Sequence, residues 1–410
     1  MICYFYISYN LEFLMLKNFQ VSKYSLIQFI KINFFLLVPF ILFGQNKLIV
    51  GIEKTDLYFP HIENKNIAVV SNHTSKFYIN NKKIHLVDSL INQGFNIQKV
   101  FAPEHGFRGN SDAGEKIINS IDAKTGIPII SLYGSKKKPS NADLENIELM
   151  IFDIQDVGAR FYTYLSTLHY VMESCAENNV DLIILDRPNP NGHYIDGPVM
   201  EKESMSFVGM HPVPVVYGMT IGEYALMING ENWLKNGQKC KLKIIELSNY
   251  DRMGRYILPE KPSPNLPNLK SINLYPSLCF FEQTPVSVGR GTLNQFQVIG
   301  KPNWDKSNYQ FKPISMPGAK SPKFENQICN GINLKNEKYL SELSLKWLIQ
   351  GYKNEKNKEK FFKSGFHKLA GNKKLEKQIK NGLSEPEIKK SWVDDLNKFK
   401  KIREKYLIYN

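Results

Sequence analysis

The chain has 410 residues, of which 42% are hydrophobic and 22% are charged, and its formal net charge at pH 7 is +14. These proportions exclude a largely disordered protein, and the length allows two domains, each with its own core. The five cysteines are far apart and form no CxxC pair, so they do not indicate a zinc knuckle, and we expect buried thiols, with disulfides as the alternative in an exported protein.

Residues 1–46 are predicted to be a secretory signal peptide. Three lysines precede the apolar run FFLLVPFILFG at residues 34–44, and a polar QNK follows it. This run is shorter than the roughly 20 residues that span a bilayer, and Gln45 stands where a lipid-anchored protein would have cysteine. We therefore expect an exported protein, periplasmic or secreted, without a stable membrane anchor after cleavage; a retained N-terminal anchor is the alternative.

Beyond the leader, apolar strand-like runs alternate with helical patterns. We expect helices at 85–94, 161–179 and 220–234, and strands at 66–72, 97–103, 127–134, 147–156, 181–190 and 241–248. Strands that are apolar nearly throughout, with helices between them, are typical of a parallel sheet that is covered on both faces. Residues 47–240 are therefore predicted to form a doubly wound α/β domain.

Residues 241–410 are predicted to form a smaller α+β domain. Residues 259–277 carry five prolines and predict an extended crossover, whereas the chain from Ser384 is helical and starts with a capping box to Glu387. Residues 351–410 hold 17 Lys or Arg against 8 Asp or Glu. A basic face attracts polyanions, and anionic wall polymers or lipid headgroups fit an exported protein better than nucleic acid. The alternative is an ordinary solvated helix face.

Polar residues follow four of the predicted strands at the point where each strand ends. In an open parallel sheet, ligands bind beyond the carboxyl ends of the strands, so we expect these residues to share one rim. Glycines among them allow a ligand to approach the backbone. In chain order the clusters are Asn72 and His73; Glu104, His105 and Arg108; Asp153, Gln155, Asp156 and Arg160; and Asp186, Arg187 and Asn189.

Glu104 is the strongest candidate for a chemical role. It follows the apolar run VFAP and lies between two phenylalanines, so its carboxyl group is expected to be partly removed from water, which suits a general acid. The other clusters have structural alternatives. Asp153 and Asp186 could cap helices or form buried ion pairs with Arg160 and Arg187, and the histidines could be ordinary core residues.

The residue types at this rim suit two reactions. Carboxyl groups together with Tyr162 and Tyr164 suit sugar hydrolysis, in which a carboxylic acid protonates the leaving oxygen. They would also suit a metal-dependent amidase with His73, His105 and Asp153 as ligands, although no HExxH or HxH pattern supports a metal. The residues alone leave both reactions open.

Several longer motifs resemble a known family. They are APEHGFRG, DIQDVGARFYTY, DRPNPNG followed by DGPV, YGMTIGEYA, PSPNLPNL, LYPSLCFFEQT, GRGT and the closing SWVDDLNKFKKIREKYLIY. In this order, from about residue 48 to 410, they are similar to the bacterial exo-acting β-N-acetylmuramidases, a glycoside hydrolase family that was long catalogued without a function. In one departure, many relatives carry SEGRGT where this chain has SVGRGT, with Val288 in place of the acid.

The resemblance implies an enzyme that removes terminal N-acetylmuramic acid from the non-reducing ends of peptidoglycan fragments. It also implies a Rossmann-like domain, a smaller C-terminal domain with the active site between the two, and Glu104 as the catalytic acid. As the second catalytic group we expect Asp156 or Asp153, which would activate water or orient the substrate's 2-acetamido group. We expect no metal or other cofactor. The alternative is a protein that binds peptidoglycan without cleaving it.

The remaining candidates are expected to bind the sugar. N-acetylmuramic acid carries a lactyl carboxylate, and a guanidinium group recognises a carboxylate at two points. The candidates for this contact are Arg108, Arg160, Arg187 and Arg290. His105 and Asn72 would bind hydroxyls or hold Glu104, and Glu282 is available in place of the missing acid. The predicted substrate-binding residues are Asn72, His73, His105, Arg108, Gln155, Arg160, Tyr162, Tyr164, Asp186, Arg187, Asn189, Glu282 and Arg290.

Overall fold

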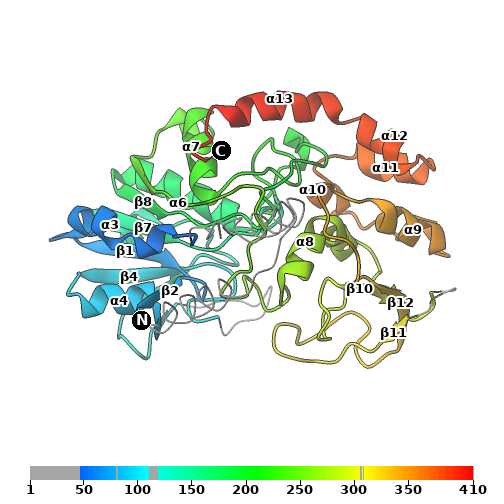
Figure 1. Ribbon diagram of the computed structural model, residues 1–410, viewed down its shortest axis with the longest axis horizontal. Coiled ribbons are helices and arrows are strands. Elements are labelled where there is room, and N and C mark those ends of the chain that lie inside the picture. Colours follow the sequence, from blue (N-terminus) through cyan, green and yellow to red (C-terminus); the bar gives the residue numbers. More distant parts are fainter. Residues whose placement is uncertain (1–46, 80–81, 110–118, 305–306, 308, 410) are drawn as a thin grey trace, which may run out of the picture. The chain divides into compact units, whose positions relative to one another are not determined.

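The computed structural model describes residues 47–79, 82–109, 119–304, 307 and 309–409, so the predicted signal peptide lies outside the described residues. None of the described helices is long and apolar enough to cross a membrane. The elements of the first part (Figure 1) are α3 (Thr55–Ile62), β1 (Ile67–Ser71), β2 (Lys76–Ile79), β3 (Lys82–His85), α4 (Leu86–Asn92), β4 (Ile97–Ala102), β5 (Ser120–Ile121), β6 (Pro128–Ser131), α5 (Asn141–Leu144), β7 (Leu149–Asp153), α6 (Tyr164–Asn178), β8 (Asp181–Leu185), α7 (Ile221–Gly230) and β9 (Leu242–Ile245).

Seven of these strands form one sheet in the order β5-β6-β4-β1-β7-β8-β9. The edge strand β5 is antiparallel to β6, and all other neighbours are parallel. From β1 the chain moves outward through β4 and β6 on one side, and then through β7, β8 and β9 on the other. The strand order therefore reverses next to β1, which is where sheets of this kind bind ligands.

Helices cover both faces of this sheet. Successive strand residues point to opposite faces. Val70 and Phe152 pack in one core with side chains of α6 and α7, and Val69 and Ile151 pack in a second core with side chains of α3 and α4. The predicted doubly wound α/β fold is confirmed, and each helix and strand predicted before residue 250 is present. The β2–β3 hairpin, α3, the short edge strand β5 and the short helix α5 were not predicted.

The prediction of an extended crossover over the proline-rich segment 259–277 is wrong for its second half. Leu269–Leu278 form a largely buried helix, α8, which starts with an asparagine capping box. Pro276 lacks the N–H that would bond to Ile272 one turn earlier. The freed carbonyl of Ile272 instead accepts a hydrogen bond from the side chain of Asn191 (3.0 Å). The helix tolerates its proline because a distant residue supplies the missing donor.

The later elements form the smaller α+β part that was predicted. Three antiparallel strands pair in the order β10-β12-β11. The predicted boundary at residue 240 stays a prediction, although β9 pairs with β8 in the first sheet. The strands are β10 (Val298–Lys301), β11 (Tyr309–Phe311) and β12 (Cys329–Asn333), and the helices are α9 (Lys346–Asn354), α10 (Phe366–Ala370), α11 (Lys374–Lys380), α12 (Glu385–Lys390) and α13 (Val393–Glu404).

The C-terminal helices return to the first sheet. The predicted capping box is present at the start of α12, where Ser384 donates to Glu387 (2.6 Å). Helix α13 runs back to α7 (Figure 1), and the guanidinium group of Arg403 donates two hydrogen bonds to the carbonyl oxygen of Gly218. The cysteines of the described chain are free and buried, as predicted: Cys175, Cys240, Cys279 and Cys329.

Candidate active site

A cavity of about 430 Å³ lies beyond the carboxyl ends of the parallel strands. Its volume falls in the range of about 300 to 1,000 Å³ that small-molecule sites occupy. Residues that follow β4 and β6 or precede α6 line one part of it, residues between positions 263 and 323 line most of the rest, and Val208 completes the lining. Of the predicted site residues, the lining includes Glu104, His105, Tyr162, Glu282 and Arg290.

The end of β4 fixes the position of Glu104. Pro103 follows the last strand residue and has no N–H with which to continue the ladder. A tight turn comes next, in which the N–H of Gly106 donates to the carbonyl of Pro103 (3.0 Å). His105, inside this turn, has a φ of 74°, a left-handed conformation that strains a residue other than glycine. The backbone thus delivers Glu104 to the cavity from a constrained turn.

Two hydroxyl groups hold the carboxyl group of Glu104. Tyr133 donates to Oε1 (3.0 Å) and Thr163 donates to Oε2 (3.1 Å). Burial, and then the neighbouring carboxylate, raises the pKa of Tyr133, so its hydroxyl stays neutral. Because a hydroxyl can donate or accept, this pair can hold the carboxyl group both before and after it gives up a proton. Neither residue was predicted; Tyr133 lies inside the predicted strand 127–134, but the observed strand β6 ends at Ser131, so Tyr133 follows it.

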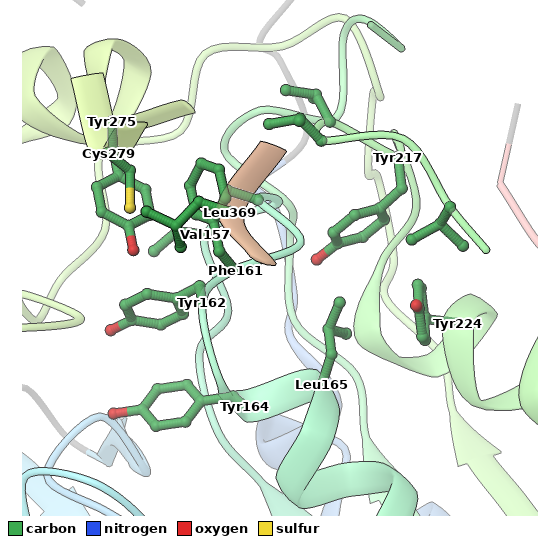
Figure 2. Close-up of a cluster of buried hydrophobic side chains, with 14 of the residues drawn as sticks. Val157, Phe161, Tyr162, Tyr164, Leu165, Tyr217, Tyr224, Tyr275, Cys279 and Leu369 are labelled. Carbon is green, nitrogen blue, oxygen red and sulfur yellow. The ribbon is translucent and has the colours of Figure 1, made fainter. Parts of the chain in front are cut away.

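Three tyrosine rings stand next to one another beside Glu104. Tyr162 and Tyr275 line the cavity, whereas Tyr164, which was also expected to bind the sugar, is buried and does not line it. Tyr162 lies edge-on to Tyr164, with ring centroids 4.8 Å apart, and edge-on to Tyr275 at 5.9 Å. Figure 2 shows the three hydroxyl oxygens on the same side of the cluster. Tyr162 donates to the carbonyl of Pro262 (2.7 Å), and Tyr164 donates to the main-chain oxygen of Glu104 (3.4 Å). Aromatic faces with polar edges suit the mixed surface of a sugar ring.

Glu282 and Arg290 form an ion pair in the wall of the cavity. The Nε of Arg290 donates to Oε1 of Glu282 (3.0 Å), and Nη2 donates to the same oxygen. Val288, at which the chain departs from the SEGRGT motif, also lines the cavity and is buried. Lys323 lines this wall as well and was missed, because it follows no predicted strand and belongs to no motif.

Asp153 and Arg187 form a buried ion pair, which is one of the structural alternatives predicted for them. Nε of Arg187 lies 2.5 Å from Oδ1 of Asp153, and Nη2 lies 2.9 Å from Oδ2. Asp153 is 0% exposed and Arg187 is 4% exposed, and neither lines the cavity. The expected roles of Asp153 in catalysis and of Arg187 in substrate binding therefore need correction, because each group is already bound by the other.

Asp156 is also held inside the protein and not at the cavity. Its Oδ2 accepts hydrogen bonds from the hydroxyl of Tyr217 and from the N–H of Gly158 (2.7 Å). Burial raises the pKa of Asp156 to about 6. Because its side chain does not line the cavity, its expected role as a second catalytic group also needs correction.

Asp186 is the centre of a hydrogen-bond network that joins the end of β8 to the start of α7 and to the C-terminal residues. Its two carboxylate oxygens accept from the hydroxyls of Thr220 and Tyr409 (both 2.7 Å) and from the N–H groups of Arg187 and Gly222 (both 2.9 Å). Burial raises the pKa of Asp186 to about 6. With every contact made to its own chain, Asp186 is structural and does not bind substrate in this arrangement.

Arg160 does not reach the cavity either. It is 2% exposed, and its guanidinium group donates to the carbonyl oxygens of Pro198 (2.7 Å), Val213 (2.7 Å) and Leu369 (2.9 Å). Burial lowers the pKa of Arg160 to about 9. The arginine therefore joins the first part of the chain to α10, and the expectation that it binds a substrate carboxylate needs correction.

Arg108 is bound on two sides by aspartates. It donates to both oxygens of Asp122 (3.1 and 2.7 Å) and to both oxygens of Asp88 (3.3 and 2.9 Å). These contacts use four of the five N–H groups of the guanidinium group that was expected to bind a substrate carboxylate. Of the four candidate arginines, Arg290 is thus the one that the structure brings to the cavity.

The other predicted residues contact their own chain. Asn72 donates to the hydroxyl of Tyr164 (2.8 Å), so it supports Glu104 indirectly. Gln155 donates to the carbonyl of Pro188 (2.8 Å), Asn189 to that of Met219 (2.8 Å), and the ring of His73 lies 2.7 Å from the carbonyl of Lys261. Within the described residues, no group of three His, Cys, Asp or Glu side chains is placed to hold a metal, and His73, His105 and Asp153 form no such set.

The fold and the cavity together define a class of protein. A doubly wound α/β protein with a carboxylic acid at its strand ends, and with aromatic rings and an ion pair around the same cavity, has the features of an enzyme that acts on sugars. The comparisons agree, because the family model "Exo-beta-N-acetylmuramidase NamZ, N-terminal" matches residues 67–270 and its C-terminal counterpart matches residues 273–409. The chain belongs to this family of exo-β-N-acetylmuramidases.

Relatives match over nearly the whole chain. The peptidoglycan β-N-acetylmuramidase NamZ of Bacillus subtilis (strain 168) is 36% identical over 376 residues, which cover 86% of this chain and 89% of the relative. A solved structure of a DUF1343 family protein from Bacteroides fragilis is 47% identical, with a TM-score of 0.82 over 89% of this chain and 99% of that one. A second from the same organism is 27% identical, with a TM-score of 0.77 over 88% and 99%.

Proposed function

We propose that this protein removes terminal N-acetylmuramic acid from the non-reducing ends of peptidoglycan fragments, with Glu104 as the general acid. The observation that carries this proposal is the position of Glu104, which lines the cavity with its carboxyl group held by two hydroxyls. The relative from Bacillus subtilis, which is named for this activity, supports the substrate. The protein would act in the turnover and recycling of the cell wall.

In this mechanism Glu104 gives its proton to the glycosidic oxygen as the bond to the sugar breaks. The second group then has to activate water or orient the 2-acetamido group. Asp153 and Asp156 are buried elsewhere, so this role passes to Glu282, which also lines the cavity. Both hydrogen bonds from Arg290 go to Oε1 of Glu282, which leaves Oε2 for a water or an N–H of the substrate.

The decisive experiment is to compare the Glu104→Gln variant with wild type on a chromogenic β-N-acetylmuramide. The amide keeps the size of the side chain but has no proton to give, so we expect kcat to fall by about 10² to 10⁴. Melting temperature and sugar binding should not change. The exposed Glu63→Gln is the matched control and should retain full activity. Full activity in Glu104→Gln would refute the assignment.

The same assay separates the rival functions. A protein that only binds peptidoglycan would release no chromophore even as wild type, although it would still bind the sugar. A metal-dependent amidase would lose its activity on addition of a chelator, whereas the proposed acid mechanism should be indifferent to it. An amidase cleaves an amide and releases no chromophore from a glycoside, so a peptide-bearing muramic acid is run beside the chromogenic muramide, each with and without chelator. The two substrates together distinguish all three.

We also propose that the protein is exported and acts in the periplasm or outside the cell. The basic residues and apolar run of the first 46 residues support this, as does a substrate that lies in the wall. Cell fractionation followed by sequencing of the mature N-terminus is the test. An unprocessed N-terminus in the cytoplasmic fraction would contradict export.

A further inference from the structure

Lys323 has an unusual environment in the wall of the cavity. Its ammonium group donates to the main-chain carbonyl oxygens of Phe281 (3.0 Å), Glu282 (3.4 Å), Thr284 (2.9 Å) and Val286 (3.1 Å). Within the described part of the chain, no carboxylate forms an ion pair with it. Four carbonyl dipoles therefore hold a cation to which none of the described carboxylates is paired.

This leaves the wall with an excess of positive charge. The wall carries two cations, Arg290 and Lys323, and one anion, Glu282, which is paired with Arg290. Partial burial, and then the repulsion of Lys363, lowers the pKa of Lys323 to about 8; Arg290 acts in the same direction, whereas Glu282 and the buried thiol of Cys279 oppose it. A partly buried cation without a counter-ion is costly to maintain, and an anionic ligand would relieve this cost.

We propose that Lys323 and Arg290 together form a carboxylate subsite that binds the lactyl group of N-acetylmuramic acid and so selects this sugar over N-acetylglucosamine. The inference rests on the proposed function. Both side chains line the same cavity as Glu104. The two sugars differ only at the 3-oxygen, which carries the lactyl carboxylate in one and a hydrogen in the other. Of the four carbonyl oxygens, that of Glu282 is the most distant from the ammonium group of Lys323. A substrate carboxylate would therefore compete with this oxygen for a hydrogen bond from Lys323.

The first test is the selectivity of Lys323→Met. We expect the variant to lose about 10- to 100-fold in kcat/KM on a chromogenic β-N-acetylmuramide, mainly through a higher KM. On the matching β-N-acetylglucosaminide the change should be under 3-fold, so the ratio of the two values collapses. The exposed Lys312→Met serves as the control and should leave both values unchanged. An equal loss on both substrates would mean that Lys323 only supports the wall, and would overturn the proposal.

A second variant, Lys323→Arg, and the pH dependence of wild type test the subsite even if Lys323→Met folds poorly. With wild type, kcat/KM on the muramide should fall as the pH rises through about 8, because the deprotonated amine no longer attracts the carboxylate. The kcat/KM for the glucosaminide should not fall in this pH range. In Lys323→Arg, whose charge persists to higher pH, the fall for the muramide should move to higher pH. A fall that is the same for both substrates, or that stays in place in Lys323→Arg, would contradict the subsite.

Calorimetry with the free sugars separates this inference from the proposed function. Wild type should bind N-acetylmuramic acid more tightly than N-acetylglucosamine, and Lys323→Met should bind both equally. If wild type shows this preference but cleaves neither chromogenic substrate, the proposed function fails while the subsite stands. If wild type binds the two sugars equally, or binds neither, the subsite is refuted whatever the activity.

Discussion

Replacing Arg187 by methionine should destabilise the protein strongly, because it would strand the carboxylate of Asp153. The two side chains are 4% and 0% exposed and are joined by two hydrogen bonds of 2.5 and 2.9 Å. Removing one member of such a pair costs about 3 to 5 kcal/mol, since a buried charge is left without a partner. That is a large part of the roughly 5 to 15 kcal/mol by which folded domains are stable.

The size of this loss should depend on pH in a definite direction. Burial raises the pKa of Asp153 even in the presence of the arginine, and without the arginine this pKa should rise further. A carboxyl group whose pKa is higher in the folded than in the unfolded state contributes stability at low pH and loses it as the pH rises. The Arg187→Met variant should therefore be closest to wild type near pH 5 and furthest from it near pH 8.

Urea unfolding followed by tryptophan fluorescence at these two pH values measures the effect. The double variant Asp153→Asn, Arg187→Met removes both charges and should recover about half of the loss or more. The exposed Arg255→Met is the control and should change the free energy of unfolding by under about 0.5 kcal/mol. A loss below about 1 kcal/mol, or a double variant as unstable as the sum of its two single changes, would refute the reasoning.

Three further variants test other features. Tyr409→Phe removes one donor to Asp186 and should cost about 1 to 2 kcal/mol in urea unfolding. Gly158→Ala should lower the melting temperature far more than Gly94→Ala. Both positions have a positive φ, but an added Cβ at Gly158 would lie 2.0 Å from the side chain of Asn189, whereas one at Gly94 would contact nothing within 4 Å. Tyr133→Phe keeps the ring but removes a hydrogen bond to the proposed acid, so kcat should fall about 10-fold without loss of stability; an unchanged kcat would contradict the role given to this hydroxyl.

Most of the first sheet was predictable because its signal is local. Strands β1 and β7 are buried along their whole length, so four consecutive residues of each are apolar before the strand ends in Ser71 or Asp153. Helix α8 was not predictable in the same way. Its tolerance of Pro276 depends on Asn191, a donor from a distant part of the chain, and no local pattern reveals such a contact.

The position of the site was predictable from the sequence, but the residues that line it were not. The end of β4 placed Glu104 at the cavity, as predicted from the rule that ligands bind beyond strand ends. The ends of β7 and β8 carry equally polar residues, yet Asp153 and Arg187 bind each other instead. Which polar groups pair inside and which face the cavity depends on the register of neighbouring strands. Lys323 follows no strand end, so the strand-end rule does not predict it.

The network around Asp186 has a consequence for how the protein is made. The hydroxyl of Tyr409 donates to Asp186, and the N–H groups of Ile408 and Tyr409 donate to Glu223. Both residues are synthesised long after β9 is complete. At about 5 to 20 residues per second, the roughly 160 intervening residues take about 8 to 30 s to emerge from the ribosome. During that time two buried carboxylates lack their last partners. A chain that stops a few residues short should therefore remain open to proteases and chaperones.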